Sequence, residues 1–95
     1  MSQTIDEDDI QKVRQGLMEF LCKNTRHNVR HNKPTDFEIE KFRVERFSTI
    51  PNRDYFNRIV TIIAERYTEI EVKGSVVRLS PIGLDKCGQY VKNLP

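Results

Sequence analysis

The hydrogen-bonding side chains best placed to recognise another molecule lie in residues 52–67. Apolar residues in this segment recur every three or four positions and therefore share one helix face: Phe56, Ile59, Val60, Ile63 and Tyr67. The opposite side is polar and carries Asn52, Arg53, Asp54, Asn57, Arg58, Thr61 and Glu65. Every one of these side chains can make hydrogen bonds. The segment predicts an amphipathic helix, with Pro51 in its first turn, whose outer face either binds a polar partner or is simply solvated.

A second group of polar and basic side chains lies in residues 24–34. Its members are Arg26, His27, Arg30, His31 and Lys33. The run has almost nothing to bury and ends at Pro34, which predicts a loop. Such a loop either lies along a polyanion as a flexible arm or is solvated. Two histidines four positions apart could bind a metal on a helix, but no carboxylate or cysteine stands beside them, so no metal is expected.

The charge of the chain is modestly positive. It carries 16 Lys and Arg against 14 Asp and Glu, a formal net charge of +2. Four of the acids stand together at residues 6–9, and without them the remainder has 16 basic against 10 acidic residues, or +6. This balance suits a polyanionic partner such as nucleic acid, although many protein domains share it.

The two cysteines do not predict a site. Cys22 and Cys87 are far apart and have no C-x-x-C spacing, so neither a disulfide nor a zinc site is expected and both are taken as reduced thiols. Cys22 lies off the apolar face of its helix, which leaves it exposed or in a dimer contact. A redox switch at Cys22 is a hypothesis that mass spectrometry under peroxide tests.

Enzymatic chemistry has little support in the residues. The acids at 6–9 belong to a solvated helix start, the sequence has no glycine-rich phosphate loop, and neither cysteine has a histidine at a recognisable spacing. We therefore expect no enzyme and no cofactor. The sequence also has no apolar run of membrane-spanning length and no signal peptide pattern, so a cytoplasmic location without a membrane partner is expected.

The first half of the chain predicts two helices. The first is expected over residues 6–24, with an apolar face formed by Ile10, Val13, Leu17, Phe20 and Leu21. Thr35 and Glu38 have the spacing of a capping box, which predicts a second helix over 36–47. The apolar residues of that segment do not share a helical face, so a strand with a bulge near Lys41 is the alternative.

The second half predicts a hairpin and a last helix. Ile70 and Val72 alternate with glutamates, a short turn follows at 73–75, and 76–79 reads as the returning strand. Ser80 and Pro81 are expected to begin the last helix. Its predicted buried face consists of Leu84, Cys87, Val91 and Leu94.

This order resembles the winged helix-turn-helix family. The matching parts are the helix at 52–67, the hairpin at 69–79 and the exit Leu79-Ser80-Pro81-Ile82-Gly83, which is similar to the Leu-Thr-x-x-Gly of multiple-antibiotic-resistance repressors. The resemblance implies an α+β, mainly helical fold. We expect a single domain over residues 1–95, with residues 1–5 disordered and 24–34 a basic loop. Three helices, a two-stranded wing and a C-terminal helix are expected.

The resemblance also implies a function, which is binding of double-stranded DNA by a transcriptional regulator. The helix at 52–67 would lie in the major groove, where Arg58 reads guanine and Asn57 reads adenine. Asn52, Arg53 and Thr61 would contact bases or phosphates. Lys73 and Arg78 of the wing would contact phosphates, as would the loop residues Arg26, Arg30 and Lys33.

Two further expectations concern partners. A winged-helix module can instead bind protein through the same helix, and this alternative gains if Asp54, Glu65, Glu69 and Glu71 interrupt the positive surface. A homodimer is expected because a twofold pair doubles the contacts on a palindromic site. Its predicted contacts lie on the first and last helices, at Met18, Cys22, Tyr90 and Leu94.

Overall fold

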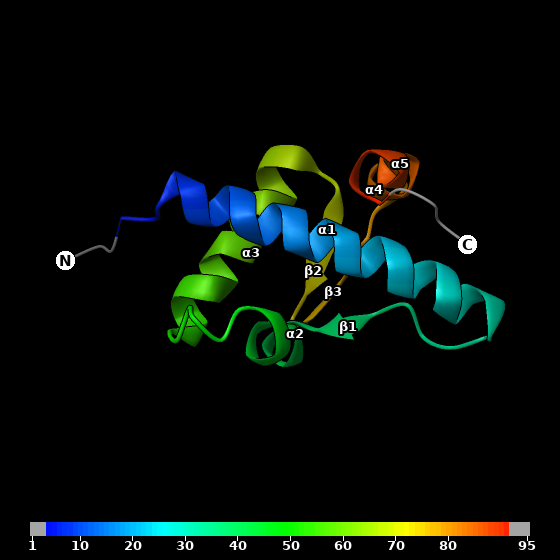
Figure 1. Ribbon diagram of the computed structural model, residues 1–95, viewed down its shortest axis with the longest axis horizontal. Coiled ribbons are helices and arrows are strands. Elements are labelled where there is room, and N and C mark those ends of the chain that lie inside the picture. The colour runs from blue at the N-terminus through cyan, green and yellow to red at the C-terminus, as the bar shows by residue number, and fades with distance from the viewer. Residues whose placement is uncertain (1–3, 92–95) are drawn as a thin grey trace.

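Helices make up most of the computed structural model, which describes residues 4–91 (Figure 1). The elements in chain order are α1 (Glu7–Arg30), β1 (Phe37–Glu38), α2 (Ile39–Arg46), α3 (Arg53–Tyr67), β2 (Ile70–Lys73), β3 (Val76–Leu79), α4 (Pro81–Asp85) and α5 (Cys87–Tyr90). The three strands form one antiparallel sheet in the order β1-β3-β2. The chain is therefore α+β and mainly helical, as predicted, and its sheet has one strand more than the expected hairpin.

Helix α1 begins where the sequence predicts and ends later. Asp6 caps it by accepting a hydrogen bond from the backbone N–H of Asp8, and acids fill its first turn, where the helix dipole favours them. The predicted loop at 24–34 is wrong for its first seven residues, because α1 continues to Arg30. The helix ends at a turn in which the Asn28 side chain donates to the Pro34 carbonyl and Asn32 adopts a left-handed conformation (φ 54°).

Both interpretations of residues 36–47 hold in part. Phe37 and Glu38 pair with Val77 and Val76 of β3, and the helix predicted over this segment begins only at Ile39. The predicted capping box is wrong. Glu38 is the extended residue at the N-cap position, before the helix, and its side chain makes no capping hydrogen bond. Residues Ile39 and Phe42 are buried whereas Val44 is 56% exposed, which explains the scattered apolar pattern.

Helix α3 is the element that the sequence predicts best. The Asn52 Oδ1 accepts the backbone N–H of Tyr55 at 2.9 Å and caps the helix, so Pro51 lies before the cap and not in the first turn. The predicted apolar face is confirmed for its first four members, and Tyr67 is half-buried. Helix α3 packs against the first half of α1 and leaves its other side to solvent (Figure 1).

The hairpin of β2 and β3 matches its prediction. Ile70 pairs with Leu79 and Lys73 with Val76, and Gly74 takes a positive φ of 61° in the turn. A left-handed φ suits glycine because it has no Cβ. The backbone N–H of Ile39 donates to the Ser75 carbonyl, which holds the turn against the start of α2.

The predicted last helix is divided into α4 and α5. Ser80 caps α4 and Pro81 opens it, as expected, but Val91 is extended and ends the helical segment. Leu84 is exposed instead of buried, because Gly83 is the residue that faces the sheet: a Cβ on Gly83 would lie 2.0 Å from the Glu69 carbonyl oxygen. The predicted contact Leu94 lies outside the described residues.

A disulfide joins Cys22 of α1 to Cys87 of α5, with Cα atoms 5.6 Å apart. The prediction of two reduced thiols is therefore wrong. The cysteines are 65 residues apart in sequence, and only the packing of α5 onto α1 brings them together. The same packing buries Cys22 and Met18 completely, which contradicts their expected exposure in a dimer contact.

Residues 1–3 lie outside the described part of the chain, and with them most of the segment predicted to be disordered. Ile5 lies in the described part, is half-buried and packs against the apolar core, so for this residue the expectation is wrong. Within residues 4–91, no helix is both long and apolar enough to cross a membrane.

Candidate functional site

The outward face of α3 presents the polar residues that the sequence singled out. Arg53, Arg58 and Thr61 are exposed and Asn57 is half-buried. Neither arginine has an ion-pair partner among residues 4–91. The Thr61 hydroxyl donates to the Asn57 carbonyl at 2.9 Å, so it is held by its own helix. The structure thus brings these predicted residues together on one solvent-facing surface, which we call the α3 face.

Asn52 lies at the beginning of the α3 face, and one of its two polar side-chain atoms is already hydrogen-bonded. Its amide oxygen caps the helix, and its amide nitrogen remains to donate. Acids accompany the basic residues, because Asp54 and Glu65 are exposed on the same helix. The α3 face therefore has cations and anions interspersed.

The start of α1 borders the α3 face. The backbone N–H of Asp6 donates to the Tyr55 hydroxyl at 3.1 Å, and that hydroxyl donates to the Asp9 carboxylate at 2.8 Å. Glu7 forms an ion pair with Arg66. A hollow of about 320 Å³ lies here, lined by Ile5, Asn57, Arg58, Thr61 and Ile62. This arrangement fixes an acidic helix start beside the predicted contact residues, a placement that the sequence did not predict.

The predicted wing residues differ in availability. Lys73 is exposed at the end of β2, next to the turn. Arg78 Nε lies 3.0 Å from the Glu71 carboxylate, so its charge is partly neutralised. Because the turn is bonded to the start of α2, the hairpin does not extend beyond the sheet as a long wing would.

The basic residues of 24–34 lie at the opposite end of the molecule from the α3 face (Figure 1). Arg26, His27 and Arg30 belong to the last turns of α1, and His31 and Lys33 follow it, all exposed. They belong to a rigid helix end and not to a flexible arm. The rings of His27 and His31 contact each other at an interplanar angle of 41°, with centroids 4.4 Å apart. Within residues 4–91, no three His, Cys, Asp or Glu side chains lie together as a metal site requires.

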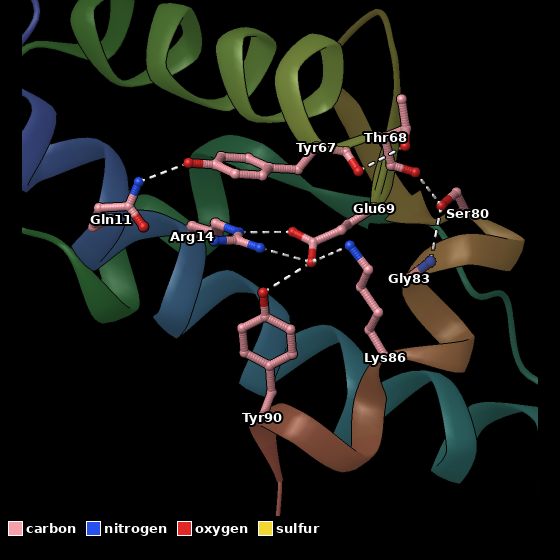
Figure 2. A network of polar contacts seen from close by, with 9 residues as sticks. All are labelled: Gln11, Arg14, Tyr67, Thr68, Glu69, Ser80, Gly83, Lys86 and Tyr90. Atoms are coloured by element: carbon pink, nitrogen blue, oxygen red, sulfur yellow. Dashed lines mark hydrogen bonds and ion pairs between the residues drawn. The ribbon is translucent and has the colours of Figure 1, made fainter.

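A buried ionic cluster around Glu69 is the feature that the sequence did not reveal (Figure 2). The Glu69 side chain is 0% exposed, and Arg14 of α1 donates to both carboxylate oxygens at 2.8 and 3.0 Å. The Tyr90 hydroxyl donates to Oε2 at 2.8 Å, and Lys86 Nζ lies 3.6 Å from the same oxygen. The cluster joins α1, the start of the hairpin and the C-terminal helices.

The pKa shifts of Glu69 and Tyr90 agree with the hydrogen bonds of the cluster. Burial by itself raises the pKa of Glu69, but the hydrogen bonds from Arg14 and Tyr90 and the charge of Lys86 lower it overall, so the carboxylate is ionised. Burial, together with the hydrogen bond to Glu69, raises the pKa of Tyr90 to about 12. A carboxylate with partners on both oxygens is typical of a structural cluster rather than of a general base.

Nothing in the local sequence identifies this cluster. In the alternating pattern of residues 69–72, Glu69 occupies a position that is expected to face solvent. Arg14 and Tyr90, which cover it, are 55 and 21 positions away in sequence, so the local pattern does not report their contacts. Its position also explains why Gly83 must lack a side chain, since α4 lies directly on the Glu69 backbone.

Comparison of the chain with protein-family models, with curated proteins and with solved structures found no match.

Proposed function

We propose that this chain is a winged helix-turn-helix protein that binds double-stranded DNA and acts as a transcriptional regulator. The order α1, β1, α2, α3, β2, β3 supports the proposal, as does the sheet order β1-β3-β2, in which the short strand before α2 pairs with the returning strand of the hairpin. In this interpretation α2 and α3 are the helix-turn-helix, α3 is the recognition helix, and the hairpin is a minimal wing.

The observation that carries the proposal is the α3 face. Arg58 lies exposed on it, with Asn57 beside it, and Arg53 stands at the start of the helix. An arginine can bridge O6 and N7 of guanine, and an asparagine can pair with adenine in the same bidentate way, when a helix lies in the major groove. Arg53 and the amide nitrogen of Asn52 would contact a base edge or a phosphate near the helix N-terminus.

The α3 face and its surroundings carry charges of both signs, and the cations among them form the surface that would contact phosphates. Two of the acids that would interrupt it are neutralised: Glu69 is buried in its cluster, and Glu71 is paired with Arg78. Lys73 is the exposed cation of the wing and would contact a phosphate, adding affinity without sequence information. Asp54, Glu65 and the acidic start of α1 remain as opposing charges that would weaken binding.

The proposal is tested by fluorescence anisotropy with a random 20-base-pair duplex at 20 to 200 mM salt. The wild-type protein is expected to bind at low salt and to lose affinity as salt rises. Arg58→Ala should weaken binding several-fold, because it removes an exposed cation from the α3 face. Arg66→Ala is the matched control, because Arg66 belongs to the same helix but is paired with Glu7, and it should bind like the wild type.

A protein-binding role is the second candidate, and one observation favours it. The hollow on the α3 face combines Ile5 and Ile62 with Asn57 and Arg58, a mixture of apolar and polar groups typical of protein interfaces. The same anisotropy experiment separates the two candidates. Absence of any binding to duplex DNA at 20 mM salt would contradict DNA binding and favour the protein partner.

A further inference from the structure

The start of α1 lies along a row of α3 side chains at the border of the α3 face. Arg58, Ile62 and Arg66 follow one another at intervals of four positions, so they form one line along the helix. Ile5 lines the hollow of about 320 Å³ together with Arg58 and Ile62. Glu7 forms an ion pair with Arg66, at the end of the row. The chain from Ile5 to Glu7 therefore covers one side of α3 where the two helices pack together (Figure 1).

A tyrosine of α3 holds the same part of α1 in place. Tyr55 is buried, and its hydroxyl accepts the backbone N–H of Asp6 at 3.1 Å and donates to the Asp9 carboxylate at 2.8 Å. These two hydrogen bonds lie on either side of Glu7 in the sequence. The Glu7 carboxylate is therefore presented to Arg66 by a fixed first turn of the helix and not by a free chain end.

The ion pair of Glu7 and Arg66 is easily opened. The Glu7 side chain is 61% exposed and the Arg66 side chain is 42% exposed, so water and salt screen their attraction and the pair contributes little to stability. The Arg66 guanidinium can exchange the carboxylate for another anion without disturbing the core. A DNA phosphate is such an anion, because it accepts hydrogen bonds from a guanidinium as a carboxylate does.

We propose that the first turn of α1 is an autoinhibitory element, in which Glu7 occupies Arg66 and withholds it from DNA phosphates. The inference rests on the proposed function, because it concerns DNA bound at the α3 face. Binding exchanges the Glu7 carboxylate for a phosphate on Arg66 and so adds a cation to the contacts made by Arg58. The acids at 6–9 repel the same phosphates and limit the affinity of the wild type. Arg66 is thus a phosphate contact that its ion pair conceals.

Fluorescence anisotropy with the random duplex over a range of salt concentrations tests this inference. Glu7→Gln should raise affinity at low salt about threefold and make the slope of log affinity against log salt steeper by about one, since one more phosphate is neutralised. Asp8→Asn is the matched control: it removes one charge from the same turn, but Asp8 has no ion-pair partner among residues 4–91. Its salt slope should equal that of the wild type. Circular dichroism checks that both variants are folded.

A second substitution tests the role of Arg66 directly. Adding Arg66→Ala to Glu7→Gln should return the salt slope to that of the wild type, whereas Arg66→Ala alone should leave the slope unchanged. Equal salt slopes of Glu7→Gln and Asp8→Asn, in proteins that bind the duplex, would overturn this inference and leave DNA binding itself supported. If neither the wild type nor any variant binds at low salt, the proposed function is wrong and the autoinhibitory role is excluded with it.

Discussion

Two regions of this molecule use the same kinds of residue in opposite ways. Around Glu69, the charged groups are packed between helices, and both carboxylate oxygens have protein partners. On the α3 face, Arg53 and Arg58 point to solvent and have no ion-pair partner within residues 4–91. The Glu69 cluster connects α1 to the hairpin and the C-terminal helices. The arginines of the α3 face form no ion pair that connects two elements within residues 4–91.

This difference in burial and pairing determines which charges are available for a partner. A buried carboxylate must keep its cations to remain ionised, so Arg14 is committed to the fold. An exposed arginine gains little from a surface ion pair and loses little by exchanging water for a phosphate or a base. Charge composition alone cannot separate the two groups, because both count equally in the net charge of +2. Variants that disturb one region should therefore leave the other intact.

The largest effect is expected from the disulfide beside the Glu69 cluster. Replacing Cys22 and Cys87 together by Ala should lower the free energy of unfolding by about 4 kcal/mol, because the bond closes a long loop in the unfolded chain. Urea denaturation of the wild type, with and without dithiothreitol, and of the double variant measures this. Equal midpoints for all three samples would show that the bond contributes nothing to stability.

Breaking the ion pair of Glu69 should have the next largest effect. Arg14→Met removes the bidentate partner of a fully buried carboxylate and should lower the free energy of unfolding by about 3 kcal/mol. Arg66→Met is the control, since it breaks the exposed pair with Glu7 and should change stability little. Chemical denaturation compares the two variants. If they are equally stable, the distinction between the two regions is wrong.

The same cluster predicts a pH dependence. The folded pKa of Glu69 lies below its unfolded value of about 4.3, so its stabilisation is fully present above that value and is lost as the pH falls through the folded pKa. The stability difference between the wild type and Arg14→Met should therefore shrink below about pH 4. Denaturation curves at pH 7, 5 and 3 test this, and a constant difference would contradict it.

A smaller effect is expected at Tyr90. Its pKa is raised to about 12, so the hydroxyl stays protonated beyond its unfolded value, and the stabilisation is present below about pH 10 and lost as the pH rises through 12. Ultraviolet titration should show a tyrosine ionisation near pH 12 that is missing in Tyr90→Phe. Loss of the hydrogen bond in that variant should lower stability by about 1 to 2 kcal/mol. A wild-type titration without a late step would contradict the cluster.

The sequence predicted the parts of the fold that depend on local pattern. The amphipathic face of α3, the hairpin and the Ser80-Pro81 helix start follow from spacing and capping, which are properties of neighbouring residues. The predicted end of α1 was wrong, because Thr25 is buried by tertiary packing and the Asn28 side chain donates a hydrogen bond to the Pro34 carbonyl. No local propensity reports either event.

The candidate site was predictable to the same extent. Arg53, Asn57 and Arg58 share the α3 face because helical spacing places them there. The Glu69 cluster and the disulfide were missed because their partners are 17 to 65 positions apart in sequence and meet only in the folded chain. The acids at 6–9 were predicted to be a solvated helix start, but their position beside α3 depends on contacts with Tyr55 and Arg66, which no sequence pattern reports.

The most direct test of the central claim is amide NMR of the labelled protein titrated with a random DNA duplex at low salt. If the α3 face binds DNA, the amide signals of residues 52–61 and of the hairpin turn at 73–75 should shift as DNA is added. Signals around Glu69 should stay in place, because that cluster serves the fold. Shifts confined to residues 23–33, or no shifts at all, would contradict the account.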